Sequence, residues 1–274
     1  MGDLSVTALY TSGAWSWGGV RGAECLASDD AKRVFRVTNA ALRLARPWSP
    51  PSLPHALLWR HALIDFLLAQ RAPTKVLELA SGFSPRGFSA SENPLLTYIE
   101  IDRPAVIERK RSLLARSTLG KEALERSNWQ LLSSDVIADS FEAQLESPPP
   151  QLIIAEGLFM YLDVETQRSL QRRIAAMLAP GGTLIFDLVP PCEQPAPSAA
   201  GRALGWMMRR FSGQGFAPDT RTRTEIVRDL QADGFAEVEI FDPDHPPPNF
   251  SPPTTDLAFD QVVFAAKVKR DDLP

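Results

Sequence analysis

The chain has 274 residues, a formal net charge of -4 at pH 7 and a pI near 5.5. Hydrophobic residues make up 44% and charged residues 23% of it, which is ordinary globular usage and not that of a disordered chain. The acidic balance argues against broad electrostatic binding to nucleic acid or to an anionic membrane surface. The sequence contains no apolar run of 18 residues and no basic start followed by an apolar stretch, so we expect a cytoplasmic protein.

The cysteines and histidines are too scattered to predict a metal site. Cys25 and Cys192 lie far apart, with no Cys-x-x-Cys spacing, and are interpreted as reduced thiols. His55, His61 and His245 do not cluster in the sequence either. We therefore predict no bound metal.

The N-terminal quarter of the chain predicts two helices after an irregular start. Residues 1–30 are expected to be irregular, and a helix is expected to open with Asp29 or Asp30 as its N-cap. A proline-rich break follows at Arg46–Pro54. Apolar residues at helical spacing from Leu57 to Leu68 then predict a second helix that ends before Pro73.

From Thr74 onward, short apolar runs alternate with amphipathic segments. The predicted strands are Lys75–Leu79, Thr97–Ile101, Trp129–Ser133, Leu152–Glu156, Thr183–Leu188, Ala236–Phe241 and Gln261–Val268. The predicted helices are Ala105–Ser117, Ser140–Leu145, Val164–Met177 and Arg223–Asp233. This alternation is typical of an α/β fold: a Rossmann-like, seven-stranded, mostly parallel sheet with helices on both faces. The last two strands have only a proline-rich connection between them, so we expect them to pair as an antiparallel hairpin.

The stretch between Leu188 and Arg223 is an insertion after a predicted strand. It is rich in proline and carries Trp206, Met207, Met208 and Phe211. Additions at the carboxyl ends of strands in such a sheet cover the ligand crevice, so we interpret residues 189–222 as a helical lid. The alternative is a peripheral helix packed on the edge of the sheet.

The loop after the first strand predicts a ligand without phosphates. Gly82 lies in a tight turn at this point, where glycine lets the backbone approach a ligand. A dinucleotide-binding turn would read G-x-G-x-x-G, but Ala80 and Pro85 occupy the other two glycine positions. A nicotinamide-dependent oxidoreductase is therefore the weaker reading of this loop.

Carboxylates follow three of the predicted strands. Asp102 comes 20 positions after Gly82 and is placed either to accept hydrogen bonds from the ribose hydroxyls of a nucleoside or to cap the next helix. Asp135 would accept a hydrogen bond from an adenine amino group, with the amide of Val136 facing a ring nitrogen. Glu156 would meet the amino group of an amino-acid cofactor.

The ordered segments ELASG, IEIDRP, SSDV, IIAEGLFMYL and LAPGGTLIFDL resemble a class I S-adenosylmethionine (SAM)-dependent methyltransferase. Within that superfamily they resemble the leucine carboxyl methyltransferase family, including its bacterial polyketide O-methyltransferase branch. The EGLFMYL stretch is the most specific piece. The first loop departs from the family pattern, because only Arg86 matches the Asp-Thr-Arg that usually follows the glycines.

The resemblance implies a site for SAM. It implies that Lys32 and Arg60 bind the methionine carboxylate, although both could instead be solvated cations on helix surfaces. It also implies the roles given above for Asp102 and Glu156. The full implied cofactor set is Lys32, Arg60, Glu78, Ser81, Gly82, Asp102, Arg103, Asp135, Val136 and Glu156. Tyr161 is the candidate for lining the methyl-transfer site, the alternative being a buried aromatic.

These expectations define an enzyme that methylates an oxygen. Methyl transfer needs donor, carbon and acceptor held in line and water excluded. A carboxylate acceptor needs no general base, whereas a hydroxyl benefits from one. We therefore expect a carboxylate or hydroxyl acceptor on a small molecule or peptide, with a non-catalytic binding module as an alternative. Residues 1–73 are expected to cover the cofactor site and residues 74–274 to form the methyltransferase domain.

Overall fold

The computed structural model describes residues 6–45, 53–137, 141–188, 219–254 and 261–269. Its centre is a seven-stranded sheet in the order β3-β2-β1-β4-β5-β7-β6. The first five strands run parallel, and β7 pairs antiparallel with both β5 and β6. The strands are β1 (Lys75–Leu79), β2 (Thr97–Asp102), β3 (Trp129–Ser133), β4 (Leu152–Ala155), β5 (Thr183–Leu188), β6 (Phe235–Phe241) and β7 (Val262–Val268).

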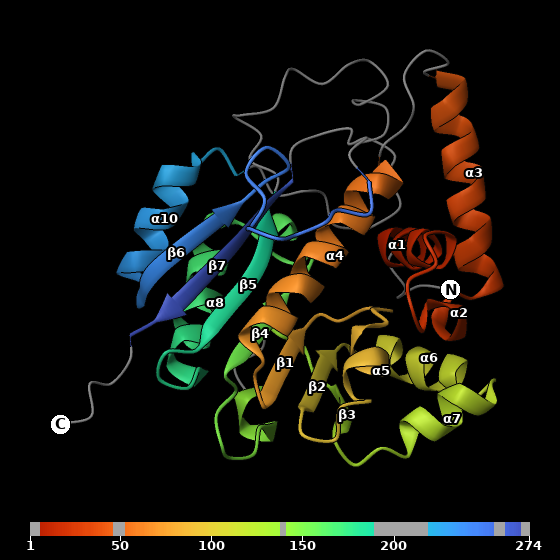
Figure 1. The fold of residues 1–274 in the computed structure, drawn as a ribbon, viewed down its shortest axis with the longest axis horizontal. Helices are drawn as coiled ribbons and strands as arrows, with labels where there is room; N and C mark the ends of the chain where they lie inside the picture. The colour runs from red at the N-terminus through yellow and green to blue at the C-terminus, as the bar shows by residue number, and fades with distance from the viewer. Residues whose placement is uncertain (1–5, 46–52, 138–140, 189–218, 255–260, 270–274) are drawn as a thin grey trace.

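The sheet is buried on both faces, which makes three layers (Figure 1). Because successive strand residues point to opposite faces, Val76 and Ile154 pack in one core while Leu77 and Ile153 pack in the other. The first core takes in residues of α4 (Leu53–Arg71) and α6 (Pro104–Leu114), and the second takes in residues of α8 (Val164–Met177) and α10 (Arg223–Ala232).

The predicted sheet is confirmed: each of the seven strands was placed to within one residue at either end, and the C-terminal pair is antiparallel. The helices were placed less well. The segment expected as a helix at 140–145 contains a 3-10 turn, η1 (Phe141–Gln144). Two short helices, α5 (Arg86–Ala90) and α7 (Thr118–Leu124), were not predicted, since neither has the three or four turns needed for a clear apolar period.

The prediction of an irregular N-terminus is wrong. Residues 6–26 contain α1 (Val6–Trp17) and α2 (Ala23–Leu26). Helix α1 has no charged residue and little amphipathic pattern, so its stability depends on packing against α3 (Asp29–Ala45) and α4. A Cβ at Gly13 would lie 2.6 Å from the Cβ of Phe35, which shows how closely α1 and α3 approach. The predicted cap of α3, Asp29 or Asp30, is also wrong by one or two positions, because Ser28 Oγ accepts from the Ala31 N–H at 3.1 Å.

Most of the predicted lid lies outside the described residues. The structure resumes at Asp219, and Thr222 caps α10 through a capping box with Glu225. Within the described ranges, no helix is both long and apolar enough to cross a membrane.

Candidate functional site

A layer of buried charge lies between the sheet and the helices on one of its faces. Glu78 on β1, Glu100 on β2 and Asp187 on β5 each follow, at a spacing of two, a strand residue packed in the first core. Glu156 follows β4 in the same register. All four carboxylates therefore face α4, α5 and α6, and each is at most 4% exposed. A carboxylate in such a place must find cations or donors, and the helices supply them.

Arg86 is the hub of this layer. From the first turn of α5, its Nη1 donates to Glu78 at 2.7 Å and its Nη2 donates to Glu156 at 2.7 Å. Its Nε donates to Asp65 of α4 at 2.5 Å. Burial alone would lower the pKa of Arg86, but these three carboxylates raise it well above its usual value. Arg86 therefore carries a full charge and joins β1, β4, α4 and α5.

Arg60 forms the second bridge. Its Nε donates to Glu156 at 2.8 Å and its Nη1 donates to Asp187 at 3.0 Å, and the residue is only 5% exposed. His61 Nδ1 lies 3.1 Å from the same Glu156. Burial works to raise the pKa of Glu156, but Arg60, His61 and Arg86 together hold it well below its ordinary value. Glu156 is thus a firmly ionised carboxylate at the end of β4.

The cluster of ion pairs around Arg60 and Arg86 contains more carboxyl groups than guanidinium groups. Arg60 and Arg86 face four carboxylates, those of Asp65, Glu78, Glu156 and Asp187. Nearby, Lys110 balances the charge of Glu100, and the carboxylate of Glu100 also accepts a hydrogen bond from Trp129 Nε1. A ligand that brings an ammonium or sulfonium group would offset the surplus.

The first loop and the end of β2 form a second part of the site. The Gly82 N–H donates to Asp102 Oδ2 at 2.7 Å and the Arg103 N–H donates to Oδ1 at 2.7 Å. Each oxygen keeps a second acceptor position, so the carboxylate can still receive two hydroxyl donors. Burial raises the pKa of Asp102, and the two backbone donors only partly oppose this. Its charge is therefore held in an unfavourable place that further donors would improve.

The residues around Asp102 fit a nucleoside cofactor. Gly82 has φ +52, and in the part of the chain that the structure describes no heavy atom lies within 4 Å of a Cβ built there. Ser81 Oγ is buried and has no hydrogen-bond partner among the described residues. An open approach beside an unused hydroxyl and a two-oxygen acceptor is what the ribose and amino-acid parts of SAM need.

The other predicted cofactor residues are more dispersed. Asp135 is exposed after β3 and accepts from the Ile137 N–H at 2.9 Å, while Val136 is 6% exposed. Arg103 is exposed at the N-cap of α6. Lys32 is exposed on α3 and does not belong to the buried charge layer. Glu78 belongs to that layer, where it holds Arg86 and accepts from Tyr98 at 2.8 Å.

Tyr161 links the charge layer to the N-terminal helices. It lies in η2 (Phe159–Tyr161), and its hydroxyl shares a hydrogen bond with Thr7 of α1. Burial raises the pKa of this phenol, so it stays protonated near neutral pH. Trp15 of α1 lies 4.8 Å from His61, measured between ring centroids. Two side chains of α1 thus reach the groups around Glu156.

Sequence reasoning missed His61, Arg86 and Asp187 as members of the site. Arg86 was noticed as a family match without a role, and Asp187 stands inside the LIFDL segment. Asp187 carried a signal that could have found it, a charged residue inside an apolar strand pattern, and His61 carried a similar one inside the apolar helical pattern of α4.

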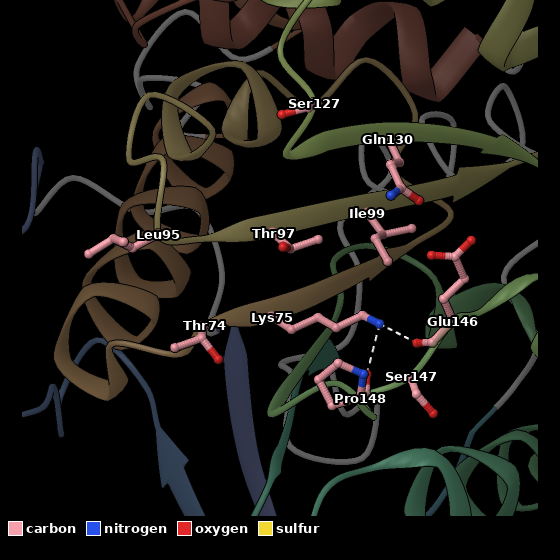
Figure 2. A pocket seen from close by; sticks show the side chains of 10 residues that line it. All are labelled: Thr74, Lys75, Leu95, Thr97, Ile99, Ser127, Gln130, Glu146, Ser147 and Pro148. Carbon is pink, nitrogen blue, oxygen red and sulfur yellow. Dashed lines mark hydrogen bonds between the residues drawn. The ribbon is translucent and has the colours of Figure 1, made fainter.

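A separate hollow of about 350 Å³ lies at the amino ends of β1 and β2, away from these groups (Figure 2). Its lysine, Lys75, is 7% exposed and donates to the carbonyl oxygens of Glu146 and Pro148. These contacts fasten the loop before β4 to β1, and we assign the hollow no ligand.

The comparisons with known proteins decide the family. Residues 21–175, more than half of the chain, match the family model for leucine carboxyl methyltransferase. The chain belongs to the leucine carboxyl methyltransferase family. It is 31% identical over 201 residues to a protein of Mycobacterium avium (strain 104) that is provisionally named an S-adenosyl-L-methionine-dependent methyltransferase, covering 70% of this chain and 64% of that protein. A Mycolicibacterium paratuberculosis protein with the same provisional name is 35% identical over 185 residues, covering 64% of this chain and 67% of that one. The chain thus spans about two thirds of the length of these relatives.

Solved structures of methyltransferases share the fold. An O-methyltransferase-like protein from Nostoc punctiforme superposes with a TM-score of 0.56 at 17% identity, covering 96% of this chain and 72% of that one. A methyltransferase-like protein from Thermobifida fusca gives a TM-score of 0.56 at 21% identity, covering 95% and 94%. At these identities the likeness establishes the class I methyltransferase fold that the sequence predicted.

Proposed function

We propose that this chain is a SAM-dependent methyltransferase that transfers a methyl group to an oxygen of a small or peptide-like acceptor. The observation that carries the proposal is the arrangement of Ser81, Gly82 and Asp102 at the carboxyl edge of β1 and β2. Open sheets of this kind bind ligands at that edge. Family membership and the provisional names of the relatives support the same cofactor.

The residues present divide the cofactor between the two parts of the site. Asp102 would accept from the ribose hydroxyls, and Asp135 with Val136 would contact the adenine. Arg60 and Lys32 would hold the methionine carboxylate, and Glu156 would face the methionine ammonium. When bound, SAM supplies an electrophilic methyl group on a sulfonium.

A carboxylate is the acceptor that the described residues favour. His61 is 2% exposed and lies against Glu156 and Arg86, which leaves it poorly placed to take a proton from a substrate. The Tyr161 phenol, with its raised pKa, is a hydrogen-bond donor and not a base. A carboxylate is already ionised at neutral pH, so its methylation requires no base.

A two-step experiment tests this proposal. Calorimetric titration with SAM, S-adenosylhomocysteine and NADH should give heat with the first two and none with NADH. The protein is then incubated with SAM labelled in the methyl group and the low-molecular-weight fraction of a bacterial extract, and the product is treated with alkali. Methyl esters release labelled methanol, whereas methyl ethers do not. Folded protein that binds neither SAM nor S-adenosylhomocysteine would refute the proposal, and alkali-stable label would refute the carboxylate acceptor.

A further inference from the structure

Asp187 is a buried carboxylate whose place in the fold calls for an explanation. It lies on β5 and is 0% exposed. Its strand neighbour Ile185 packs in the first core, on the face turned toward α4. For stability alone, apolar side chains in place of both Asp187 and Arg60 would serve as well, because burying a charged pair usually costs at least as much as the pairing returns. The presence of aspartate therefore points to a role in the site.

Three donors from three other segments converge on this carboxylate. Oδ1 accepts from the Gly157 N–H at 2.6 Å. Oδ2 accepts from Arg60 Nη1 at 3.0 Å and from Gln261 Nε2 at 3.0 Å. Asp187 thus ties α4, the turn after β4 and the residue before β7 to β5.

The contact with Gly157 fixes the turn that carries Glu156. Gly157 has φ +69, a left-handed conformation that favours glycine. A Cβ at this position would lie 3.6 Å from both Nη atoms of Arg60, so the missing side chain leaves that side of the guanidinium uncovered by residue 157. Asp187 accepts hydrogen bonds from both Gly157 and Arg60, so it fixes the orientation of the Arg60 guanidinium relative to the turn after β4.

The two contacts of Arg60 leave part of its fork for a ligand. An arginine has five N–H donors, and here Nε donates to Glu156 while Nη1 donates to Asp187. In the described part of the chain, Nη2 has no carboxylate partner. A planar guanidinium anchored at two points presents its remaining donors in a fixed direction, which suits capture of a carboxylate.

We propose that Asp187, supported by Gln261, is a positioning residue that orients Arg60 toward the carboxylate of the cofactor's amino-acid part. This rests on the proposed function, because it takes Arg60 as the residue that binds that carboxylate. Asp187 itself touches no ligand. Replacing Asp187 should lower the affinity only for ligands that carry the amino-acid part.

Two thioether nucleosides test this directly. S-adenosylhomocysteine carries the amino acid, and 5′-methylthioadenosine lacks it while keeping adenine, ribose and sulfur. Wild-type protein should bind the first much more tightly. In Asp187→Asn the amide still accepts from Gly157, but it presents an N–H group to Arg60 instead of an oxygen. We expect this variant to bind S-adenosylhomocysteine at least ~10-fold more weakly than wild type, and its affinity for methylthioadenosine to change less than ~2-fold. The affinity ratio, that of S-adenosylhomocysteine over that of methylthioadenosine, should therefore fall at least ~5-fold.

Controls separate positioning from general loosening. Asp233 is another carboxylate that is only 6% exposed, and it receives two hydrogen bonds from Arg168. The variant Asp233→Asn should leave the affinity ratio unchanged. Gln261→Met keeps the charge of Asp187 but removes one of its three donors, and it should lower the ratio ~2- to 3-fold. This milder variant keeps the test informative if Asp187→Asn does not fold.

The outcomes distinguish this inference from the function beneath it. If wild-type protein binds neither nucleoside, the proposed function fails. If it binds both with similar affinity, Arg60 does not bind the carboxylate of the amino-acid part; this inference then fails while the proposed function stands. A large wild-type ratio that survives in Asp187→Asn and Gln261→Met would overturn the positioning role, as would tighter binding of S-adenosylhomocysteine by Asp187→Asn, which would mean that Asp187 merely screens Arg60.

Discussion

At the scale of single residues, Asp102 shows how a binding group differs from a structural one. Sequence reasoning left it between a ribose acceptor and a helix cap. The N-cap of α6 is Arg103, and the oxygens of Asp102 receive the N–H groups of Gly82 and Arg103 instead of an N–H from within that helix. Its raised pKa shows that burial disfavours the charge in the free protein. A carboxylate whose pKa is shifted by burial in this way is typical of a ligand site.

The substitution Asp102→Asn should therefore separate binding from stability. The amide keeps one oxygen for a backbone donor and sheds the unfavourable charge, so the melting temperature without ligand should stay within about 2 °C of wild type or rise. Affinity for SAM should fall ~10- to 100-fold, because a charge-assisted hydrogen bond contributes about 1.5–3 kcal/mol. Thermal scans and calorimetry measure the two effects.

The control is Ser117→Ala, which removes a cap that the structure shows. Ser117 Oγ accepts from the Gly120 N–H at 3.1 Å at the start of α7. Its loss should cost about 1 kcal/mol of stability and leave SAM affinity unchanged. An Asp102→Asn variant that loses stability but still binds SAM like wild type would make Asp102 structural.

At the scale of elements, the sequence predicted the strands, which have a clear apolar pattern, and missed helix α1, whose stability depends on packing against other helices. All seven strands were found because runs such as Val76–Leu79 and Leu184–Leu188 are mostly apolar and are followed by turn residues. Helix α1 was missed because its apolar residues follow no helical period and are buried by α3 and α4. The predicted cofactor residues were drawn from motifs, and those that follow β1 to β4 lie along the carboxyl edge of the sheet. Their ion pairs were not predictable, since Arg60 meets Glu156 and Asp187 from 96 and 127 positions away.

The turn after β4 gives the element-scale prediction. Gly157→Ala adds a methyl group 3.6 Å from the Arg60 guanidinium at a residue with φ +69. The backbone strain should cost about 1–2 kcal/mol of stability. SAM affinity should fall ~10-fold, a larger effect than the strain explains, because the methyl group covers the side of Arg60 that glycine leaves open. The measurements are denaturant unfolding and SAM titration.

Gly181→Ala is the matched control for this variant. Gly181 has φ +73 in the turn before β5, so the same substitution carries the same kind of strain. Its N–H donates to the carbonyl of Lys269 before the amino end of β5, whereas Asp187 lies near the carboxyl end of that strand. The control should lose similar stability and bind SAM normally. Equal losses of affinity in both variants would show that strain alone acts, and that Gly157 has no part in access to Arg60.

At the scale of the whole molecule, the buried charge layer ties the two halves of the sheet to the helices above them. Arg86 joins β1 to β4, and Arg60 joins the end of β4 to β5. Neither arginine is more than 5% exposed. Buried pairs of this kind do not maximise stability, but removing one partner strands the others and is costly. The layer therefore makes the fold sensitive to the protonation of its carboxylates.

Acid should reveal this dependence through Glu156. Its folded pKa is depressed, so its contribution is fully present above the unfolded value of about 4.3 and is lost as the pH falls through the folded value. Glu156→Gln should be about 3–5 kcal/mol less stable than wild type at pH 7. That gap should be constant from pH 7 to 5 and narrow below about pH 4, because wild type then loses the interaction that the variant already lacks.

Groups that do not interact with Glu156 contribute equally to both proteins and cancel in this difference, which urea unfolding at several pH values measures. Glu78 acts with the opposite sign, since burial raises its pKa and its protonation favours the folded state as the pH falls. The control is Glu142→Gln, which breaks a partly exposed pair with Arg173 and should cost less than about 1 kcal/mol at pH 7. If the gap for Glu156→Gln stays constant down to pH 3.5, or is no larger than that of the control, the arginines do not depend on Glu156. The charge layer would then hold the fold together through Glu78 and Asp187.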